Sequence, residues 1–262
     1  MDDVLIERRR GRVLELRLNR PDRMNALNTA VIDSIGRAAA SAATDNAVAA
    51  VFITAEGRAF SAGADLLEAR EQLSSGTGGF RRNLYDWQRA FCALEDCPKP
   101  VIAIVQGLAI AGGLELALSC DLIVATDRAR LGDGHITYGL VPGGGGSQRL
   151  TDAIGSRAAR WLMYTGETVD AQTALGLGLV QQVVPATEIE AWLDQLAELL
   201  SQRSPSALTF MKRMTASGQV SRERLDHEIE AAVHVVGGLD AQEGMMAFSL
   251  KRAPQFPSLA GL

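Results

Sequence analysis

Glu115 is the residue of this sequence best placed for acid–base chemistry. It stands in an apolar stretch, residues 108–118, that contains no other charged side chain. Burying a carboxylate is costly unless the group is paired or used, and burial raises its pKa toward neutrality, which suits proton transfer. The alternative is a structural carboxylate that accepts hydrogen bonds from nearby backbone amides. From the sequence, both interpretations stay open.

His135 is the second candidate for acid–base chemistry. It follows Gly132-Asp133-Gly134 in a glycine-punctuated loop that precedes Val141-Pro142. Functional residues are common in such loops, and the ordinary pKa of histidine lies close to physiological pH. The alternative is a histidine that only forms hydrogen bonds with the backbone.

Two segments place a turn of small residues between an apolar strand and a helix. One turn is Ser61-Ala62-Gly63-Ala64-Asp65 and the other is Ala111-Gly112-Gly113. The first amides of a helix lack intrahelical partners and lie at the positive end of its dipole. Two such amides facing each other would form an oxyanion hole, in which one donor is worth about 2.7–4 kcal/mol. Alternatively, the glycines serve only tight packing.

Several other motifs are incomplete in this sequence. Ala59 replaces the first glycine of a nucleophile elbow around Ser61, and Ser147-Gln148 follows the 143–146 glycines where a phosphate-binding loop needs Lys-Ser or Lys-Thr. No G-x-G-x-x-G follows the first strand, which argues against a dinucleotide cofactor. The three cysteines form no C-x-x-C pair and have no histidine at ligand spacing, so we expect no disulfide framework and no metal site.

Composition narrows the class of protein further. The 262 residues include 26 basic and 31 acidic side chains, giving a formal charge of −5, and no basic run is present, which argues against nucleic-acid binding. Residues 1–10 are charged and do not resemble a signal peptide. Residues 101–125 are apolar but contain Glu115 and Asp121, so a buried core element is preferred to a membrane span. We therefore expect a cytoplasmic protein without membrane contact.

Periodicity predicts a single α/β core followed by a helical tail. A helix over 28–43 begins at Asn28, a plausible N-cap, and further helix starts are expected at Ser204-Pro205 and at Asp240, which has Glu243 at capping-box spacing. Strand, helix and strand follow one another in the sequence, which predicts right-handed βαβ units. The apolar helical tail is interpreted as a packing or subunit surface. The predicted strands cover residues 13–18, 48–54, 101–105, 122–125 and 179–184.

Five motifs occur in a fixed order along nearly the whole chain. They are LNRP at 18–21, NALN at 25–28, RAFSAGAD at 58–65, GGLELA at 112–117 and PGGGGSQRL at 142–150, with EGM to KR at 243–252 in the tail. Through them the sequence resembles the enoyl-CoA hydratase/isomerase (crotonase) family. The resemblance implies a crotonase-like spiral of ββα units over residues 1–200 and a helical trimerisation region over 201–262. It also implies an acyl-CoA substrate, a homo-trimer or dimer of trimers, and no separate cofactor, since coenzyme A is part of the substrate.

The resemblance further assigns roles to individual positions. The backbone amides of Ala64 and Gly112 would hold the enolate oxygen of a thioester, with Glu115 and His135 as the catalytic side chains. Phe248 and Lys251 would reach the ligand of a neighbouring subunit. The remaining positions that match coenzyme A contacts of the family are Met24, Arg58, Ala62, Asp65 and Leu66.

One departure from the family pattern affects the expected reaction. Hydratases of the family use two glutamates, one matching Glu115 and one in a Gly-x-Pro-Glu loop that here reads Gly132-Asp133-Gly134-His135. The second acid–base group is then His135, or Asp133, or absent. Relatives that cleave β-diketones have a histidine in this loop and an aspartate nine residues later, where this chain has Gly144.

Enoyl-CoA hydration is the expected reaction. Isomerisation, decarboxylation or hydrolytic C–C cleavage are the alternatives within the same family. A non-catalytic acyl-CoA-binding paralogue is the alternative of a different class, and the missing second glutamate is its main support.

Overall fold

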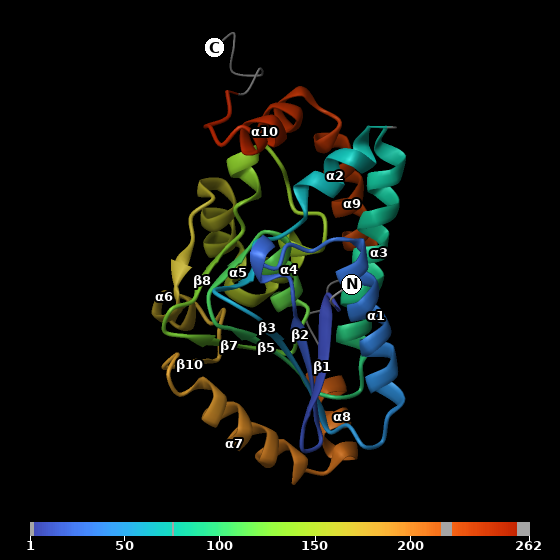
Figure 1. Cartoon of the computed structure of the whole chain (residues 1–262), viewed down its shortest axis with the longest axis vertical. Coiled ribbons are helices and arrows are strands. Elements are labelled where there is room, and N and C mark those ends of the chain that lie inside the picture. The colour runs from blue at the N-terminus through green and yellow to red at the C-terminus, as the bar shows by residue number, and fades with distance from the viewer. Residues whose placement is uncertain (1–2, 75, 216–221, 256–262) are drawn as a thin grey trace.

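The computed structural model describes residues 3–74, 76–215 and 222–255, in which the strands form two sheets (Figure 1). The six-stranded sheet has the order β1-β2-β3-β5-β7-β10, parallel except for the β1–β2 hairpin. Its strands are β1 (Leu5–Arg10), β2 (Val13–Leu18), β3 (Ala50–Ala55), β5 (Val101–Val105), β7 (Leu122–Thr126) and β10 (Gln182–Val184). The second sheet contains β4 (Ala59–Ser61), β6 (Leu108–Ile110), β8 (Arg130–Gly132) and β9 (Val169–Asp170).

A strand–strand–helix unit repeats along the chain. Each of β3, β5 and β7 is followed by a strand of the second sheet, β4, β6 or β8, and then by helical structure. This arrangement confirms the expected spiral of ββα units. The periodicity analysis missed β4, β6 and β8 because each is only three residues long, and β6 lies directly before the predicted turn at Ala111-Gly112-Gly113. Such short strands are stabilised by pairing with neighbouring strands more than by local propensity.

Ten α-helices and two short 3-10 segments are present in the described ranges. The 3-10 segments are η1 (Pro21–Arg23) and η2 (His135–Tyr138). The helices are α1 (Thr29–Thr44), α2 (Leu66–Leu73), α3 (Thr77–Asp96), α4 (Gly112–Leu118), α5 (Gly146–Thr165), α6 (Ala171–Gly176), α7 (Ile189–Ser201), α8 (Pro205–Thr215), α9 (Arg222–Val236) and α10 (Leu239–Ser249).

The helix starts test the capping predictions. The side chain of Asn28 accepts a hydrogen bond from the Val31 amide at 3.1 Å, and the Ser204 hydroxyl accepts one from Ala207 at 3.3 Å, so both predicted caps are confirmed. The predicted capping box at Asp240 is wrong, because α10 begins at Leu239 with Gly238 as its N-cap. Glu243 instead accepts hydrogen bonds from Arg252, since the chain after α10 folds back over this carboxylate.

The large sheet is covered on both faces. Alternate residues of β3 and β5, such as Val51 and Ala103, pack with α1 and α3, whereas Phe52 and Ile102 pack with α7. Burial on both faces explains why these strands read as continuous apolar runs. The predicted strand over 179–184 is shorter than expected and begins at Gln182.

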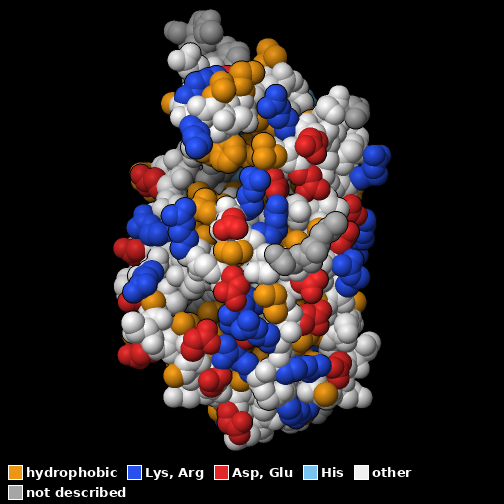
Figure 2. Space-filling model, in the orientation of Figure 1, with side chains coloured by type: hydrophobic (Ala, Val, Ile, Leu, Met, Phe, Trp, Pro, Cys, Tyr) orange, Lys and Arg blue, Asp and Glu red, His pale blue; other side chains and the backbone are white. Residues whose placement is uncertain are grey.

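The C-terminal helices α9 and α10 pack on the same chain, α9 against α3 and α10 against η2 (Figure 1). Figure 2 shows acidic and basic side chains interspersed over one face, with hydrophobic side chains gathered over α10. Within the described ranges, no helix is long and apolar enough to cross a membrane.

Candidate active site

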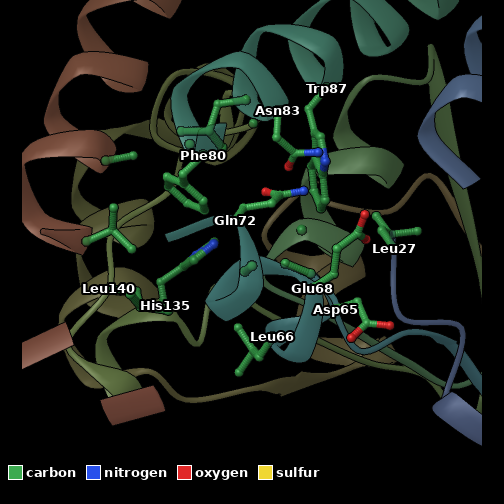
Figure 3. A pocket seen from close by; sticks show the side chains of 18 of the residues that line it. Leu27, Asp65, Leu66, Glu68, Gln72, Phe80, Asn83, Trp87, His135 and Leu140 are labelled. Carbon is green, nitrogen blue, oxygen red and sulfur yellow. The ribbon is translucent and has the colours of Figure 1, made fainter. Parts of the chain in front are cut away.

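One pocket is enclosed by α2, α3, α4, η2 and the C-terminal helices α9 and α10. Its empty space, open mouth included, is about 710 Å³. Glu115, Ala64 and Gly112 line it. His135 lines it as well and is labelled in the close-up view (Figure 3). The structure therefore brings all four predicted catalytic positions to one cavity.

The two small-residue turns lie against each other at this cavity. A Cβ atom built on Gly63 would lie 3.1 Å from the Gly112 nitrogen, and one built on Gly112 would lie 3.3 Å from the Ala64 nitrogen. Leu27 donates to the Gly63 carbonyl and accepts from Asp65, so the Ala64 amide between them faces the other way. Among the described residues, neither the Ala64 nor the Gly112 amide donates a hydrogen bond.

Backbone conformation fixes the second turn. Ala111 has a φ of 52°, a region that L-residues seldom adopt, and its amide donates to the Gly132 carbonyl at 3.1 Å. A Cβ on Gly112 would lie 2.6 Å from the Trp87 ring, so only glycine lets the indole pack on this turn. Strained backbone of this kind is concentrated at functional sites.

Glu115 is held by the glycine turn before α5. It is 2% exposed, and its Oε1 accepts hydrogen bonds from the Gly144 and Gly146 amides at 2.8 and 2.9 Å. Glu115 therefore does accept hydrogen bonds from backbone amides, as the structural alternative predicted, but only through one carboxylate oxygen. Within the described residues, Oε2 accepts no hydrogen bond, and a Cβ on Gly144 would lie 2.7 Å from it.

A second buried carboxylate, Glu228 of α9, holds the same turn from the opposite side. It accepts hydrogen bonds from the Gly145 amide, from the Ser147 hydroxyl and from the Ser147 amide, the last at 3.0 Å. Successive amides of the turn thus alternate between Glu115 and Glu228. Burial and the nearby Glu115 carboxylate raise the pKa of Glu228 to about 7.

The sequence analysis missed Glu228. In its own segment it is one of several charged residues of an amphipathic helix, and no local motif distinguishes it. The glycine segment 143–146 forms a tight turn before α5, and four successive amides from Gly144 to Ser147 bind the two carboxylates.

His135 is paired with Asp133. Its Nδ1 lies 3.0 Å from Oδ1 of Asp133, and its own amide donates to Oδ2 at 3.3 Å. Asp133 is 3% exposed and does not line the pocket, so it orients the histidine and does not face the cavity. Because Nδ1 is bound to the carboxylate, Nε2 is the ring nitrogen left for the cavity, and Figure 3 shows the ring extending inward.

Charge determines the protonation state of His135. Burial by itself lowers the pKa, but the carboxylate of Asp133, supported by Glu115 and Glu228, raises the pKa of His135 to about 9. The imidazole is therefore predominantly a cation at neutral pH. The alternative of a histidine bound only to backbone is wrong, since its partner is a buried side-chain carboxylate.

The positions expected to contact coenzyme A fall into three groups. Asp65 and Leu66 line the pocket, and Asp65 pairs with Arg20 at 2.8 Å. Met24, Arg58 and Ala62 do not line it. Both Arg58 and Ala62 contact Met24: the Arg58 guanidinium lies 3.7 Å from the Met24 sulfur, and the Ala62 amide donates to the Met24 carbonyl.

Phe248 and Lys251 lie apart from the pocket lining. The Phe248 ring packs edge-on against Tyr138 of η2, with centroids 5.4 Å apart, and Lys251 is exposed just after α10. Their contact with the ligand of another subunit stays a prediction, as does the trimer.

Residues from both predicted regions of the chain, 1–200 and 201–262, line the pocket. Ala232 and Val236 of α9 and Met245 of α10 line it beside residues of the core. The tail therefore does more than offer a packing surface, while the boundary between residues 200 and 201 stays a prediction.

Comparison with protein families gives a match over residues 8–258 to the model described as enoyl-CoA hydratase/isomerase. A 2,3-dehydroadipyl-CoA hydratase of Escherichia coli is 38% identical over 255 residues, covering 96% of this chain and 98% of the relative. A short-chain-enoyl-CoA hydratase of Clostridium acetobutylicum is 33% identical and covers 96% of both chains.

Solved structures show the same similarity in three dimensions. An enoyl-CoA hydratase from Mycobacterium avium subsp. paratuberculosis superimposes with a TM-score of 0.87 at 30% identity, over 97% of this chain and 98% of the other. An enoyl-CoA hydratase/isomerase from Pseudoalteromonas atlantica gives a TM-score of 0.82 at 31% identity, over 97% and 99%.

Proposed function

This chain belongs to the enoyl-CoA hydratase/isomerase family, and we propose that it adds water to the double bond of a 2-enoyl-CoA. The observation that carries the proposal is the convergence on a single pocket of Glu115, His135 and two backbone amides that donate no hydrogen bond among the described residues. The family match implies that the substrate is a coenzyme A thioester. The pocket contains groups that can stabilise the negative charge on the thioester oxygen and transfer the two protons of hydration.

The amides of Ala64 and Gly112 bind the thioester oxygen. When water adds to C3, negative charge moves to this oxygen, and two preorganised N–H donors stabilise it more strongly than they stabilise the neutral carbonyl. Their proximity and their lack of other acceptors within the described residues support this role.

Glu115 and His135 move the two protons. The Glu115 carboxylate takes a proton from water as the water oxygen bonds to C3, using the oxygen that the glycine turn leaves free. Protonated His135 then gives a proton to C2 of the enolate, which restores the thioester carbonyl. The raised pKa of His135, about 9, keeps this donor charged at neutral pH.

Hydrolytic C–C cleavage of a β-keto acyl-CoA is the second candidate, and the Asp133–His135 pair favours it. Water would add to the ketone carbonyl, the bond between C2 and C3 would break, and the leaving enolate would be held by the same two amides. The relatives that cleave β-diketones have an aspartate nine residues after the histidine, and this chain has Gly144 there. Asp133, two residues before the histidine, instead places a carboxylate on its ring.

Mass spectrometry of acyl-CoA esters incubated with the purified protein separates these reactions. A stable gain of water by a 2-enoyl-CoA supports hydration, and chain shortening of a β-keto ester supports cleavage. Incubation in heavy water also detects exchange at C2, which reports the enolate itself.

Glu115→Gln, prepared in parallel, is the control for contaminating host enzymes. If a short 2-enoyl-CoA and its β-keto counterpart both bind but keep their masses, without deuterium at C2, the proposal of an enzyme is wrong and the acyl-CoA-binding paralogue replaces it.

A further inference from the structure

The glycine turn that holds Glu115 contains no side chain that could fix its own conformation. Residues 143–146 are all glycine, and glycine tolerates either orientation of a peptide unit because it lacks a Cβ atom. The amides of Gly144 and Gly146 nevertheless both point at the Glu115 carboxylate, at 2.8 and 2.9 Å. Other parts of the chain must therefore hold this turn in one conformation.

The guanidinium of Arg149 binds the peptide unit that lies between the Gly144 and Gly146 amides. Its Nη1 donates to the Gly144 carbonyl oxygen at 2.6 Å, while the Gly145 amide of the same peptide unit points the opposite way and donates to Glu228. The main-chain amide of Arg149 also donates to the Gly145 carbonyl, at 3.0 Å. Reversal of this peptide unit would therefore remove one hydrogen bond from a buried cation and another from a buried carboxylate.

The guanidinium can approach the turn only because position 145 is glycine. A Cβ on Gly145 would lie 1.8 Å from Nη1 of Arg149, and Gly145 has a φ of 99°, which L-residues seldom adopt. The Arg149 side chain is 3% exposed, and it folds back from the first turn of α5 over the glycines that precede that helix. The close approach thus depends on the turn and the helix together.

Helix α3 supports the Arg149 guanidinium through two residues one turn apart. Glu95 accepts from its Nε and Nη2 at 2.7 and 2.9 Å, the two-point geometry that suits a carboxylate and a guanidinium. Four residues earlier, the centroid of the Phe91 ring lies 6.0 Å from the guanidinium carbon. A Cβ on Gly144 would be 3.1 Å from that ring, so Phe91 also lies next to the turn. Helix α3 therefore supports both the cation and the turn that the cation binds.

We propose that Arg149 is a positioning residue for the base: it fixes the glycine turn so that two of its amides stay directed at Glu115. Arg149 does not line the pocket, so it acts on the substrate only through that carboxylate. This inference rests on the proposed role of Glu115 in hydration. It assigns a function to a buried cation that the hydration chemistry leaves unused.

Arg149→Met keeps the length of the side chain but removes the cation and its hydrogen bonds. We expect kcat to fall at least about tenfold, since displacement of a catalytic group by about 1 Å can cost about 10²-fold. The dissociation constant of butyryl-CoA, measured by calorimetry, should stay close to the wild-type value because Arg149 lies outside the pocket lining. Arg157→Met, an exposed change on the same helix, is the matched control and should leave both quantities unchanged.

Two further variants separate the contact with the turn from the ion pair. Arg149→Lys keeps a cation that can reach the carbonyl but cannot also hold Glu95 at two points, so its kcat should lie between those of Arg149→Met and the wild type. Glu95→Gln keeps an oxygen that can accept from Arg149, so it should lower the unfolding temperature but reduce kcat much less than Arg149→Met. If Glu95→Gln lowered kcat as much as Arg149→Met, the ion pair and not the carbonyl contact would be responsible.

Hydrogen–deuterium exchange tests the turn without any turnover. The amides of residues 144–147 are bound to buried carboxylates and should exchange slowly in the wild-type protein. In folded Arg149→Met we expect them to exchange at least about tenfold faster, while the amides of strand β5 keep their wild-type rates. Equal acceleration in β5 would indicate global destabilisation and contradict the proposal. If Arg149→Met does not fold, Arg149→Lys takes its place in both measurements, and wild-type values there would contradict the proposal.

The exchange measurement keeps this inference separate from the proposed reaction. If the wild-type protein adds water to no 2-enoyl-CoA but the exchange of residues 144–147 responds as expected, hydration is wrong and the hold of Arg149 on the turn is right. If folded Arg149→Met keeps wild-type kcat, or if residues 144–147 keep wild-type exchange rates, the proposal is wrong. A rise in the dissociation constant as large as the fall in kcat would also contradict it, since the whole pocket would then have changed.

Discussion

Glu115 and His135 face the same pocket but are held in opposite ways. The Glu115 carboxylate accepts hydrogen bonds from two backbone N–H groups of a buried glycine turn. His135 instead pairs with a single carboxylate, Asp133, in its own loop. The first group is held by neutral backbone dipoles, and the second is a cation stabilised by a full charge.

This difference indicates how one pocket can keep a base and an acid side by side. Backbone dipoles fix the position of Glu115 without adding a charge of their own. The charge of Asp133 instead holds the pKa of His135 at about 9, well above its ordinary value. A carboxylate with one free oxygen and a histidine with a raised pKa are suited to opposite proton transfers.

Removing the base is the strongest test of this comparison. Glu115→Gln keeps the shape of the side chain but cannot take a proton, and we expect kcat for the proposed reaction to fall about 10²–10⁴-fold. Steady-state kinetics measure the loss. Glu198→Gln, an exposed change on α7, is the control and should retain wild-type kcat. A Glu115→Gln variant with wild-type kcat would exclude Glu115 as the base.

A substitution in the glycine turn can displace Glu115 without replacing either proton-transfer side chain. In Gly144→Ala the new Cβ would lie 2.7 Å from Oε2 of Glu115 and 3.1 Å from the Phe91 ring, so the carboxylate must shift. A displacement of about 1 Å can cost about 10²-fold, which is the expected loss in kcat.

Gly176→Ala is the matched control for this change, because a Cβ there meets nothing within 4 Å. It should leave kcat and the unfolding temperature nearly unchanged. If Gly144→Ala were equally silent, the position of the carboxylate would not depend on this turn.

Asp133→Asn tests the charge that supports the acid. Without the carboxylate, burial lowers the pKa of His135 from about 9, so the protonated form is lost at a lower pH. We expect kcat to fall about tenfold at pH 8 and less at pH 6, with the alkaline limb of the pH–rate profile moved toward acid. Asp33→Asn, an exposed change on α1, should leave the profile in place.

The same pair also affects stability. The folded-state pKa of His135 lies above the ordinary value of 6.5, so the stabilisation is fully present below pH 6.5 and is lost as the pH rises through about 9. Asp133→Asn should therefore flatten the change in unfolding free energy across this window. Denaturant titrations at several pH values measure it, and an unchanged slope would contradict the ion pair.

Glu228→Gln gives the smallest expected effect. Its folded-state pKa of about 7 exceeds the ordinary 4.5, so the folded protein binds more protons than the unfolded chain between these values. Stability attributable to this group therefore falls as the pH rises from 4.5 to 7. The variant should lose this slope and change kcat only a few-fold.

Glu230→Gln is the control on the same helix, since Glu230 forms an exposed ion pair with Arg81. It should keep the wild-type slope. A Glu228→Gln variant with the full slope would show that another group causes the pH dependence.

Much of the fold could be predicted from local patterns. Strand β5 matches its predicted bounds, and α1 begins after its Asn28 cap, because buried strands and capped helices leave strong signals in the sequence. The three-residue strands β4, β6 and β8 leave no such signal, since pairing with distant segments creates them. Asp240 and Glu243 had the spacing of a capping box, but the path of the chain after α10 gave Glu243 another partner.

The candidate site divides in the same way. An isolated carboxylate in an apolar helix pointed to Glu115, and a glycine-punctuated loop pointed to His135. Neither pattern showed that Glu115 would also anchor the glycine turn, or that Asp133 would pair with the histidine and not face the cavity.

Short motifs in the sequence identified the family, and the family resemblance implied the ββα spiral and the positions of four candidate catalytic residues. These were readable from the sequence because each motif is formed by residues close together in the chain. Tertiary structure alone decided that Glu228 of α9 closes the turn beneath Glu115, and that α9 and α10 complete the pocket. These features depend on which distant segments meet, and the free energy of such contacts is fixed only when the whole chain is packed.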